Sequence, residues 1–367
     1  MKEIETLFFE LIQVALCTRI CLSHTPTANE WGELYAMAKK QSLVGVCFAG
    51  LQRLGADAYG GFSRIGIDEM LYLTWMGMAA KIQKRNEVVT EQCAELQARL
   101  SADGLDSAIL KGQGIASLYC DHLRGLRQSG DIDLWIDGDR DAVLNYLREK
   151  GIKVSYTSIK HSKVEIFGDT EVEVHSRPSW FYSPIHDKRF MRWVDSVKSE
   201  QFENLNALGF CNPNVEFNLV FILIHIYRDS FEEGIGLRQL LDYYFVLLAS
   251  SEEERKDAYD MVCKLGMQKF TAAVMYVLRV SFDLKEELML CKESSERGRE
   301  LLDEILIGGN FGKFDTRYGV RRKGRLNRGF NTIERNKRFF CSYPSEILWA
   351  PVWKMWHWCW RKKHGYI

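Results

Sequence analysis

Hydrophobic residues recur at helical spacing over the first hundred residues of this 367-residue chain. Leu7, Leu11 and Ala15 lie four apart, and each has apolar neighbours. Residues 31–38 continue the pattern, and residues 68–100 are long enough for one or two helices. We expect a mostly helical region over residues 1–104.

Strict alternation of polar and apolar residues replaces that pattern in the middle of the chain. Residues 131–134 read Asp-Ile-Asp-Leu, and residues 170–175 read Thr-Glu-Val-Glu-Val-His, which is typical of half-buried strands. Residues 163–167 form a second candidate strand, joined to residues 170–175 by a Gly-Asp turn. With a short apolar strand near residues 108–110 and a helix near 139–150, these elements predict an α/β core over residues 105–200.

Helical periodicity returns over residues 201–308, with a break at Gly234-Ile235-Gly236 inside the apolar stretch 215–249. Residues 309–367 form a tail that is basic and rich in tryptophan. The predicted fold class is therefore α+β, with a sheet-containing core that mostly helical regions precede and follow.

Composition indicates the cellular compartment in which we expect the chain. The longest apolar run, near residues 219–226, is far shorter than the roughly 20 residues of a membrane span. The N-terminus is acidic early and lacks a cleavage-like segment, and the ten cysteines are scattered with no Cys-x-x-Cys pair. We expect a cytoplasmic protein without a transmembrane segment or a zinc module.

Asp131 and Asp133 carry the most informative chemistry. On a strand, both carboxylates point to one face, and hard cations such as Mg²⁺ prefer oxygen ligands. A carboxylate on a neighbouring strand would complete the site, and Glu173 is our candidate because it lies in the middle of its strand. Taken alone, each acidic pattern also fits a solvent-facing strand edge.

Upstream, a Lys111-Gly112-Gln113-Gly114 turn separates an apolar strand from a helical segment. Glycines at such a turn let backbone N–H groups approach a phosphate, and Lys111 adds positive charge. As an isolated signal, the turn equally fits a tight strand-to-helix connection.

In this order, the motifs resemble the nucleotidyltransferase superfamily that includes DNA polymerase β, and within it the bacterial family called "uncharacterised nucleotidyltransferase". The resemblance rests on Leu110-Lys111-Gly112, Tyr119, the stretch Arg127 to Leu134 and Glu173-Val174-His175. Gln113 departs from the Gly or Ser that usually follows the first glycine of the superfamily turn.

The resemblance implies a mixed-sheet core of the nucleotidyltransferase type. It implies transfer of a nucleoside monophosphate from an NTP, for example ATP, with Mg²⁺ or Mn²⁺ held by Asp131, Asp133 and Glu173. The nucleotide would be bound by a larger set of residues: Lys111, Gly112, Gly114, Arg127, Ser129, Arg238 and Asp242.

The helical stretch 215–249 contains His225, Arg228, Arg238 and Asp242, which need partners or a cleft. These residues either line the cleft opposite the carboxylates or form an intrahelical Arg238–Asp242 pair beside a core histidine.

The tail holds a strong excess of positive charge. Residues 313–367 contain 14 Lys and Arg but 3 Asp and Glu, although the whole chain has 49 of each kind. Trp349, Trp353, Trp356, Trp358 and Trp360 precede a final basic cluster. This pattern fits a helix packed on the body, RNA binding or an anionic membrane surface.

The acceptor is open among RNA, protein, a small molecule and a sugar phosphate. Two alternatives share the same residues: a degenerate nucleotide-binding or regulatory protein, and a phosphotransferase that moves the γ-phosphate.

Overall fold

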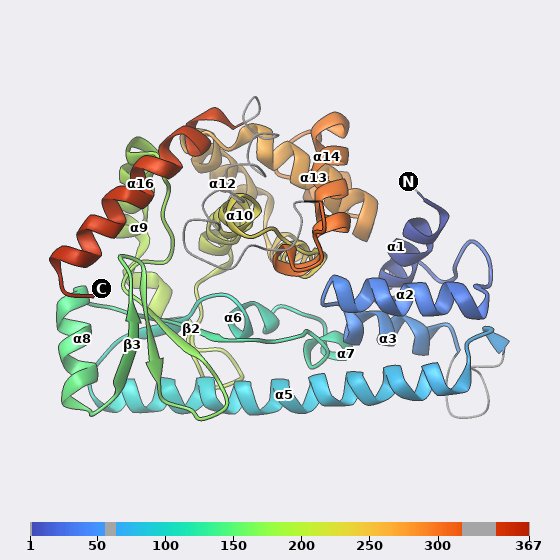
Figure 1. Cartoon of the computed structure of the whole chain (residues 1–367), viewed down its shortest axis with the longest axis horizontal. Helices are drawn as coiled ribbons and strands as arrows, with labels where there is room; N and C mark the ends of the chain where they lie inside the picture. Colours follow the sequence, from blue (N-terminus) through green and yellow to red (C-terminus); the bar gives the residue numbers. More distant parts are fainter. Residues whose placement is uncertain (1, 56–63, 318–342, 367) are drawn as a thin grey trace.

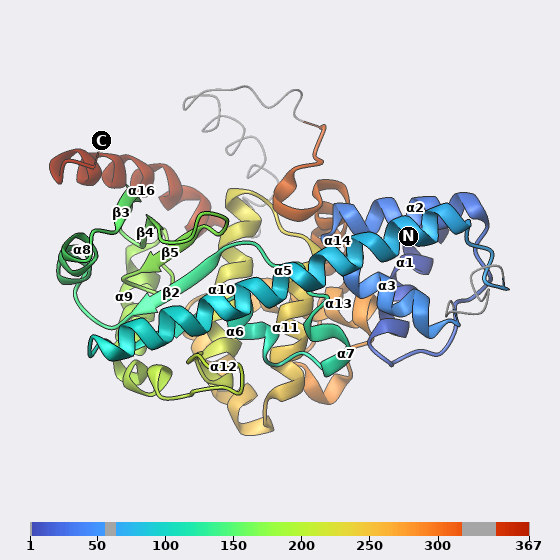
Figure 2. The same ribbon diagram turned by 90° about the horizontal axis from the view of Figure 1, so that it is seen from below.

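The computed structural model describes residues 2–55, 64–317 and 343–366 (Figure 1). Its described N-terminal part contains helices α1 (Glu3–Ala15), α2 (Ala28–Lys40), α3 (Val44–Arg53) and α5 (Glu69–Ala102). Residues 69–102 form one 34-residue helix, because Asp68 caps its first turn and no proline interrupts it. Helix α5 runs along the whole length of the molecule (Figures 1 and 2).

The predicted core contains five strands and four helices. In chain order they are β1 (Ser107–Ile109), α6 (Gln113–Ala116), α7 (Asp121–Arg124), β2 (Ile132–Ile136), α8 (Arg140–Glu149), β3 (Lys153–Thr157), β4 (His161–Glu165), β5 (Val172–His175) and α9 (Pro184–Val197). The sheet order is β1-β2-β5-β4-β3, and it is mixed, because β2 and β5 are parallel while the other neighbours are antiparallel. The α+β class is confirmed.

Three details of the sheet differ from the sequence prediction. Strand β3 was not predicted, and β4 begins two residues earlier than expected. The turn after β4 is held by α5, since Arg85 and Gln92 each donate to Asp169 at 2.9 Å. Strand β5 begins at Val172, two residues later than expected.

The two faces of the sheet have opposite chemistry. Ile132, Leu134 and Val174 point toward a core that includes residues of α5 and α8. The opposite face of β2 and β5 carries Asp133 and Glu173, which are register partners in the parallel pair. This polar face is directed toward the helices that follow the sheet in the chain.

The remaining helices are α10 (Val215–Glu232), α11 (Leu237–Ala249), α12 (Glu252–Lys264), α13 (Gln268–Phe282), α14 (Ser295–Gly308) and α16 (Pro344–Lys363), with single 3-10 turns at Ser199–Phe202, Glu286–Leu288 and Asn310–Gly312. One hydrophobic core joins α10, α11 and α13 to the N-terminal helices α1 and α3. None of the helices that the structure describes is both long and apolar enough to cross a membrane.

Candidate active site

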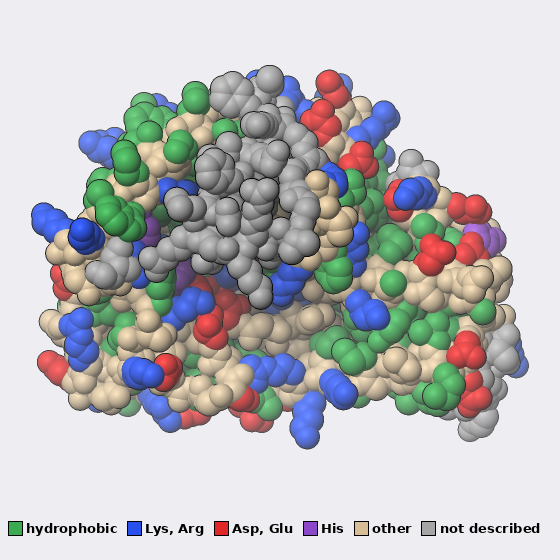
Figure 3. Space-filling view, in the orientation of Figure 1, with side chains coloured by type: hydrophobic (Ala, Val, Ile, Leu, Met, Phe, Trp, Pro, Cys, Tyr) green, Lys and Arg blue, Asp and Glu red, His purple; other side chains and the backbone are tan. Residues whose placement is uncertain are grey.

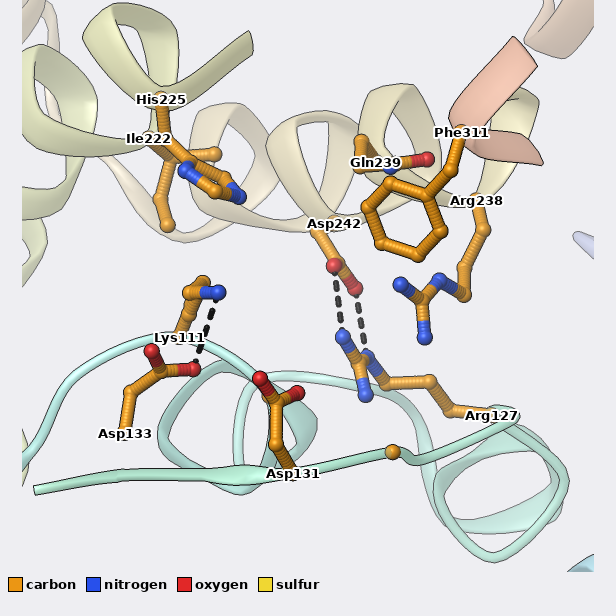
Figure 4. A pocket seen from close by; sticks show the side chains of 12 residues that line it. Lys111, Arg127, Asp131, Asp133, Ile222, His225, Arg238, Gln239, Asp242 and Phe311 are labelled. Carbon is orange, nitrogen blue, oxygen red and sulfur yellow. Dashed lines mark hydrogen bonds and ion pairs between the residues drawn. The ribbon is translucent and has the colours of Figure 1, made fainter. Parts of the chain in front are cut away.

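Asp131, the residue just before β2, and Asp133 on β2 line a pocket between the sheet and helices α10 and α11 (Figure 4). The pocket has a volume of about 460 Å³, including its part open to solvent. It is lined by Lys111, Gly112, Arg127, Gly130, Asp131, Asp133, Ile222, His225, Arg238, Gln239, Asp242 and Phe311. The pocket therefore brings together five of the seven expected nucleotide-binding residues, leaving out Gly114 and Ser129.

Asp133 is held by two partners. Its side chain is 1% exposed, and its carboxylate contacts Lys111 Nζ at 3.0 Å and His175 Nε2 at 2.9 Å. Burial alone would raise the pKa of Asp133, but the Lys111 ammonium and the His175 contact hold it well below its usual value. The pKa of Lys111 is raised in turn, because Asp133 and further carboxylates outweigh the effect of burial.

A carboxylate cluster lies beside this pair. Ligand oxygens of Asp131, Glu171 and Glu173 all lie within 4.8 Å of one another. Asp133 is in neither metal-competent group found among the described residues, so the expected trio of Asp131, Asp133 and Glu173 is not gathered as one such cluster. Glu171 was not selected from the sequence, although it shares the alternating face of β5 with Glu173.

A lysine from the neighbouring strand balances part of the negative charge of the carboxylate cluster. Lys163 on β4 contacts Glu171 and lies 3.3 Å from Glu173. These carboxylates raise the pKa of Lys163 in spite of its partial burial. Glu173 also groups with His161 and His175, and the His161 Nδ1 to Glu173 distance is 3.2 Å.

The residues of the glycine turn before α6 have separate positions in the structure. Gly112 lines the pocket with φ of 63°. A Cβ on Gly114 would lie 2.3 Å from the Ile109 carbonyl, so Gly114 permits close packing of α6 on β1. Gln113 points away from the pocket, because its side-chain amide donates to Thr90 and Asn86 of α5.

Arg127 is fixed by a buried ion pair across the pocket. Its guanidinium donates to both carboxylate oxygens of Asp242 at 2.7 and 2.8 Å, and Tyr119 donates to Asp242 at 2.7 Å. Helical spacing had left open a pair between Asp242 and Arg238 on α11. In the structure, Asp242 pairs with Arg127 and not with Arg238. Arg238 instead donates to the Gln128 carbonyl at 2.7 Å.

Several donors near the pocket have no hydrogen-bond partner within the described part of the chain. They are Arg127 Nη1, Ser129 Oγ, Arg238 Nε and Gln239 Nε2. Burial and the nearby Arg127 lower the pKa of Arg238. Since Asp242 balances the charge of Arg127, Arg238 supplies the excess positive charge at this end of the pocket. Such an arrangement favours an anionic ligand.

Phe311 was not predicted from the sequence. It lines the pocket from the turn after α14, with φ of 55° and ψ of 29°. The turn fits against the break between α10 and α11, where a Cβ on Gly234 would lie 3.1 Å from Gly312, and one on Gly236 would lie 3.0 Å from Asn310. A bulky residue in the left-handed region is strained, which is frequent at binding sites.

The other predicted polar residues of α10 divide into two groups. His225 lines the pocket and lies 3.2 Å from Asp229, whose pKa burial raises to about 7. Arg228 is 1% exposed and pairs with Glu232 and Glu346, so it has a structural role.

Residues 27–283, well over half of the chain, match the family described as Uncharacterised nucleotidyltransferase. No curated protein matches the chain. Among solved structures, the chain is similar to the crystal structure of an antigenic nucleotidyltransferase-like protein from Paracoccidioides brasiliensis, with 15% identity over 57% of this chain and 96% of that chain. The TM-score is 0.32, too low for an argument about this fold. The family match covers the sheet, α10 and α11, and it shows that the chain belongs to the uncharacterised nucleotidyltransferase family.

Proposed function

We propose that this protein transfers a nucleoside monophosphate from an NTP to an acceptor hydroxyl or phosphate, with Mg²⁺ or Mn²⁺ held at the carboxylates of β2 and β5. The observation that carries the proposal is the position of Asp131. It belongs to the carboxylate cluster and also lines the pocket that contains Arg127 and Arg238.

The donor set fits a hard divalent cation. Asp131, Glu171 and Glu173 offer only oxygen ligands, within a span that one ion can bridge. When bound, such an ion supplies Lewis-acid polarisation of a phosphoryl group and makes a hydroxyl more acidic. Asp133, kept ionised by Lys111 and His175, adds negative charge next to the cluster. Glu173 is our candidate to assist deprotonation of the acceptor.

The cationic end of the pocket suits the triphosphate. Arg127 Nη1, Arg238 Nε and Gln239 Nε2 are buried donors that an anionic oxygen would satisfy. Arg127 is oriented by Asp242, so the guanidinium needs little reorganisation when charge develops on the phosphate. Lys111 and Gly112 approach the same space from the turn before α6.

Phe311 offers an aromatic surface at the same pocket. Stacking on an aromatic ring holds a nucleobase without selecting one base by hydrogen bonds. The Arg238 guanidinium lies 5.8 Å from the centre of the Phe311 ring. A base stacked on Phe311 would therefore place its phosphates beside Arg238.

A second candidate function is NTP binding without transfer. It is favoured by the two lysines that already neutralise the carboxylates, Lys111 at Asp133 and Lys163 at Glu173. In such a protein, these lysines would replace the metal.

The test is label transfer from each α-³²P NTP with Mg²⁺ or Mn²⁺, in cell lysate separated into RNA, protein, sugar-phosphate and other small-molecule fractions. Transfer is expected with the wild type and with Asp137→Asn, an acidic residue just after β2 whose side chain pairs with Lys198. It should be absent with Asp131→Asn. Label transferred only from γ-³²P NTP would instead identify a phosphotransferase, and tight NTP binding without label would support the second candidate.

A further inference from the structure

One face of helix α16 packs against the turn between β3 and β4, the segment after β5 and the start of α8, and its opposite face is open to solvent. Trp353 stacks on Trp180 with a ring separation of 5.9 Å, and Trp360 lies against Arg140 at 4.6 Å. His357 accepts from the Ile159 backbone at 3.3 Å. Trp353 and Trp360 therefore face the body, which is one of the arrangements that the sequence left open.

The other face of α16 is an apolar stripe. Its members recur three or four residues apart and are well exposed: Leu348 58%, Trp349 39%, Val352 47%, Met355 66% and Trp356 47%. This spacing places the side chains on one side of a helix. Cys359 continues the stripe and Trp358 flanks it at 52% exposure. Hydrophobic side chains are visible along the outer edge of this helix in Figure 3.

The charged side chains on the exposed surface of α16 are all positive. Lys354, Lys362 and Lys363 are exposed. The helix contains one carboxylate, Glu346, which is 1% exposed and pairs with Arg228. Its solvent face therefore offers hydrophobic and cationic groups but no anionic one, and the stripe ends at Lys362 and Lys363.

We propose that α16 docks this protein on the surface of an anionic lipid membrane. Tryptophan, leucine and methionine would enter the boundary between headgroups and acyl chains, while the lysines would contact acidic headgroups. A second copy of the chain fits less well, because packing two such stripes together would bring like charges close. The helix lies outside residues 27–283, so this surface is separate from the family-matched part of the chain. The proposal does not depend on the proposed function.

The test is flotation of the full chain with vesicles of phosphatidylcholine alone, and with vesicles in which about 30% is phosphatidylserine. We expect the wild type to float with the anionic vesicles and to float much less with phosphatidylcholine alone. Trp349→Ser/Trp356→Ser should weaken the partition constant by about ten-fold or more. Lys362→Gln/Lys363→Gln should weaken it by about five-fold per lysine.

A matched control is Met70→Ser/Met76→Ser near the N-terminal end of α5, because these side chains are 70% and 41% exposed. This end of α5 lies far from α16 (Figure 1). The control variant should float like the wild type. All substituted side chains are exposed, so circular dichroism should show unchanged folding.

Three results would overturn the proposal. One is absence of flotation with anionic vesicles, and another is unchanged flotation of the tryptophan variant. The third is that the chain forms a dimer in sedimentation, or binds RNA in place of vesicles, and that the tryptophan variant abolishes this association. The stripe would then be the binding surface for that partner.

Discussion

The ion pair between Arg127 and Asp242 joins the segment before β2 to helix α11, and Asp242→Asn is the substitution that tests it best. The two side chains are 4% and 7% exposed. Asp242 accepts two hydrogen bonds from Arg127 and a third from Tyr119. Asparagine keeps the shape of the side chain but removes its charge, which leaves a buried guanidinium without a counter-ion.

Removing one partner of a buried ion pair costs about 3–5 kcal/mol of unfolding free energy, because the remaining charge is desolvated and unpaired. We expect Asp242→Asn to lie in that range. The double variant Arg127→Met/Asp242→Asn removes both charges, so it should be less destabilised than the sum of the single variants by about 2–3 kcal/mol.

The assay is urea unfolding of the four proteins of this cycle at neutral pH. Arg99 and Glu95 on α5 provide a matched control cycle, since they form an ion pair that is 59% and 44% exposed. Coupling in that pair should be about 0.5 kcal/mol or less. A buried-pair coupling as small as the exposed one would refute the reasoning, and so would a cost of Asp242→Asn below about 1 kcal/mol.

Three further predictions concern the site. Lys163→Met should tighten Mn²⁺ binding about five-fold in a calorimetric titration, because it removes a cation near the carboxylates of Glu171 and Glu173. The control Lys153→Met, whose lysine pairs with Glu165, should not change the Mn²⁺ affinity. Phe311→Ala should raise the KM for the NTP about ten-fold and leave kcat nearly unchanged if the base stacks there; an unchanged KM argues against stacking. The raised pKa of Asp229 means that the folded state binds the extra proton, so unfolding free energy should fall as pH rises from about 4 to about 7. Asp229→Asn should remove that part of the slope in urea unfolding, and an equal slope in both proteins would contradict the assignment.

The face of β2 could be predicted from the sequence because strand alternation depends only on local geometry. Asp-Ile-Asp-Leu requires both carboxylates on one side, and the structure has both lining the pocket. The partner strand could be proposed, but its register could not. The pairing of Asp133 with Glu173 depends on the connection through α8, β3 and β4.

The errors arise where residues distant in sequence determine a side chain's partner. Helical spacing left an Arg238–Asp242 pair open as one of two alternatives, but Arg127 approaches Asp242 from another element with two good hydrogen bonds. Phe311 lies in no motif that would have marked it as a site residue. The glycines beside it, Gly309 and Gly312, indicated only a turn. Glu171 had a signal, since it alternates with Glu173, but the sequence alone did not show which glutamate lies nearest Asp131.

The partners of the tryptophans in the tail could not be predicted from the sequence either. Spacing along the terminal helix indicated amphipathic character, but only the packing on Trp180 shows which tryptophans turn inward. Residues 318–342, including the basic run Arg321-Arg322-Lys323, lie outside the described residues.

The most direct test of the central claim is a titration of Mn²⁺ binding by electron paramagnetic resonance, with and without a non-hydrolysable NTP analogue, because it needs no knowledge of the acceptor. We expect the wild type to bind Mn²⁺ and to bind it more tightly with the analogue, since phosphate oxygens add ligands. Asp131→Asn should lose most of this binding, and Asp137→Asn should keep it. Equal Mn²⁺ affinity in the wild type and Asp131→Asn would contradict the claim that these carboxylates form the metal site.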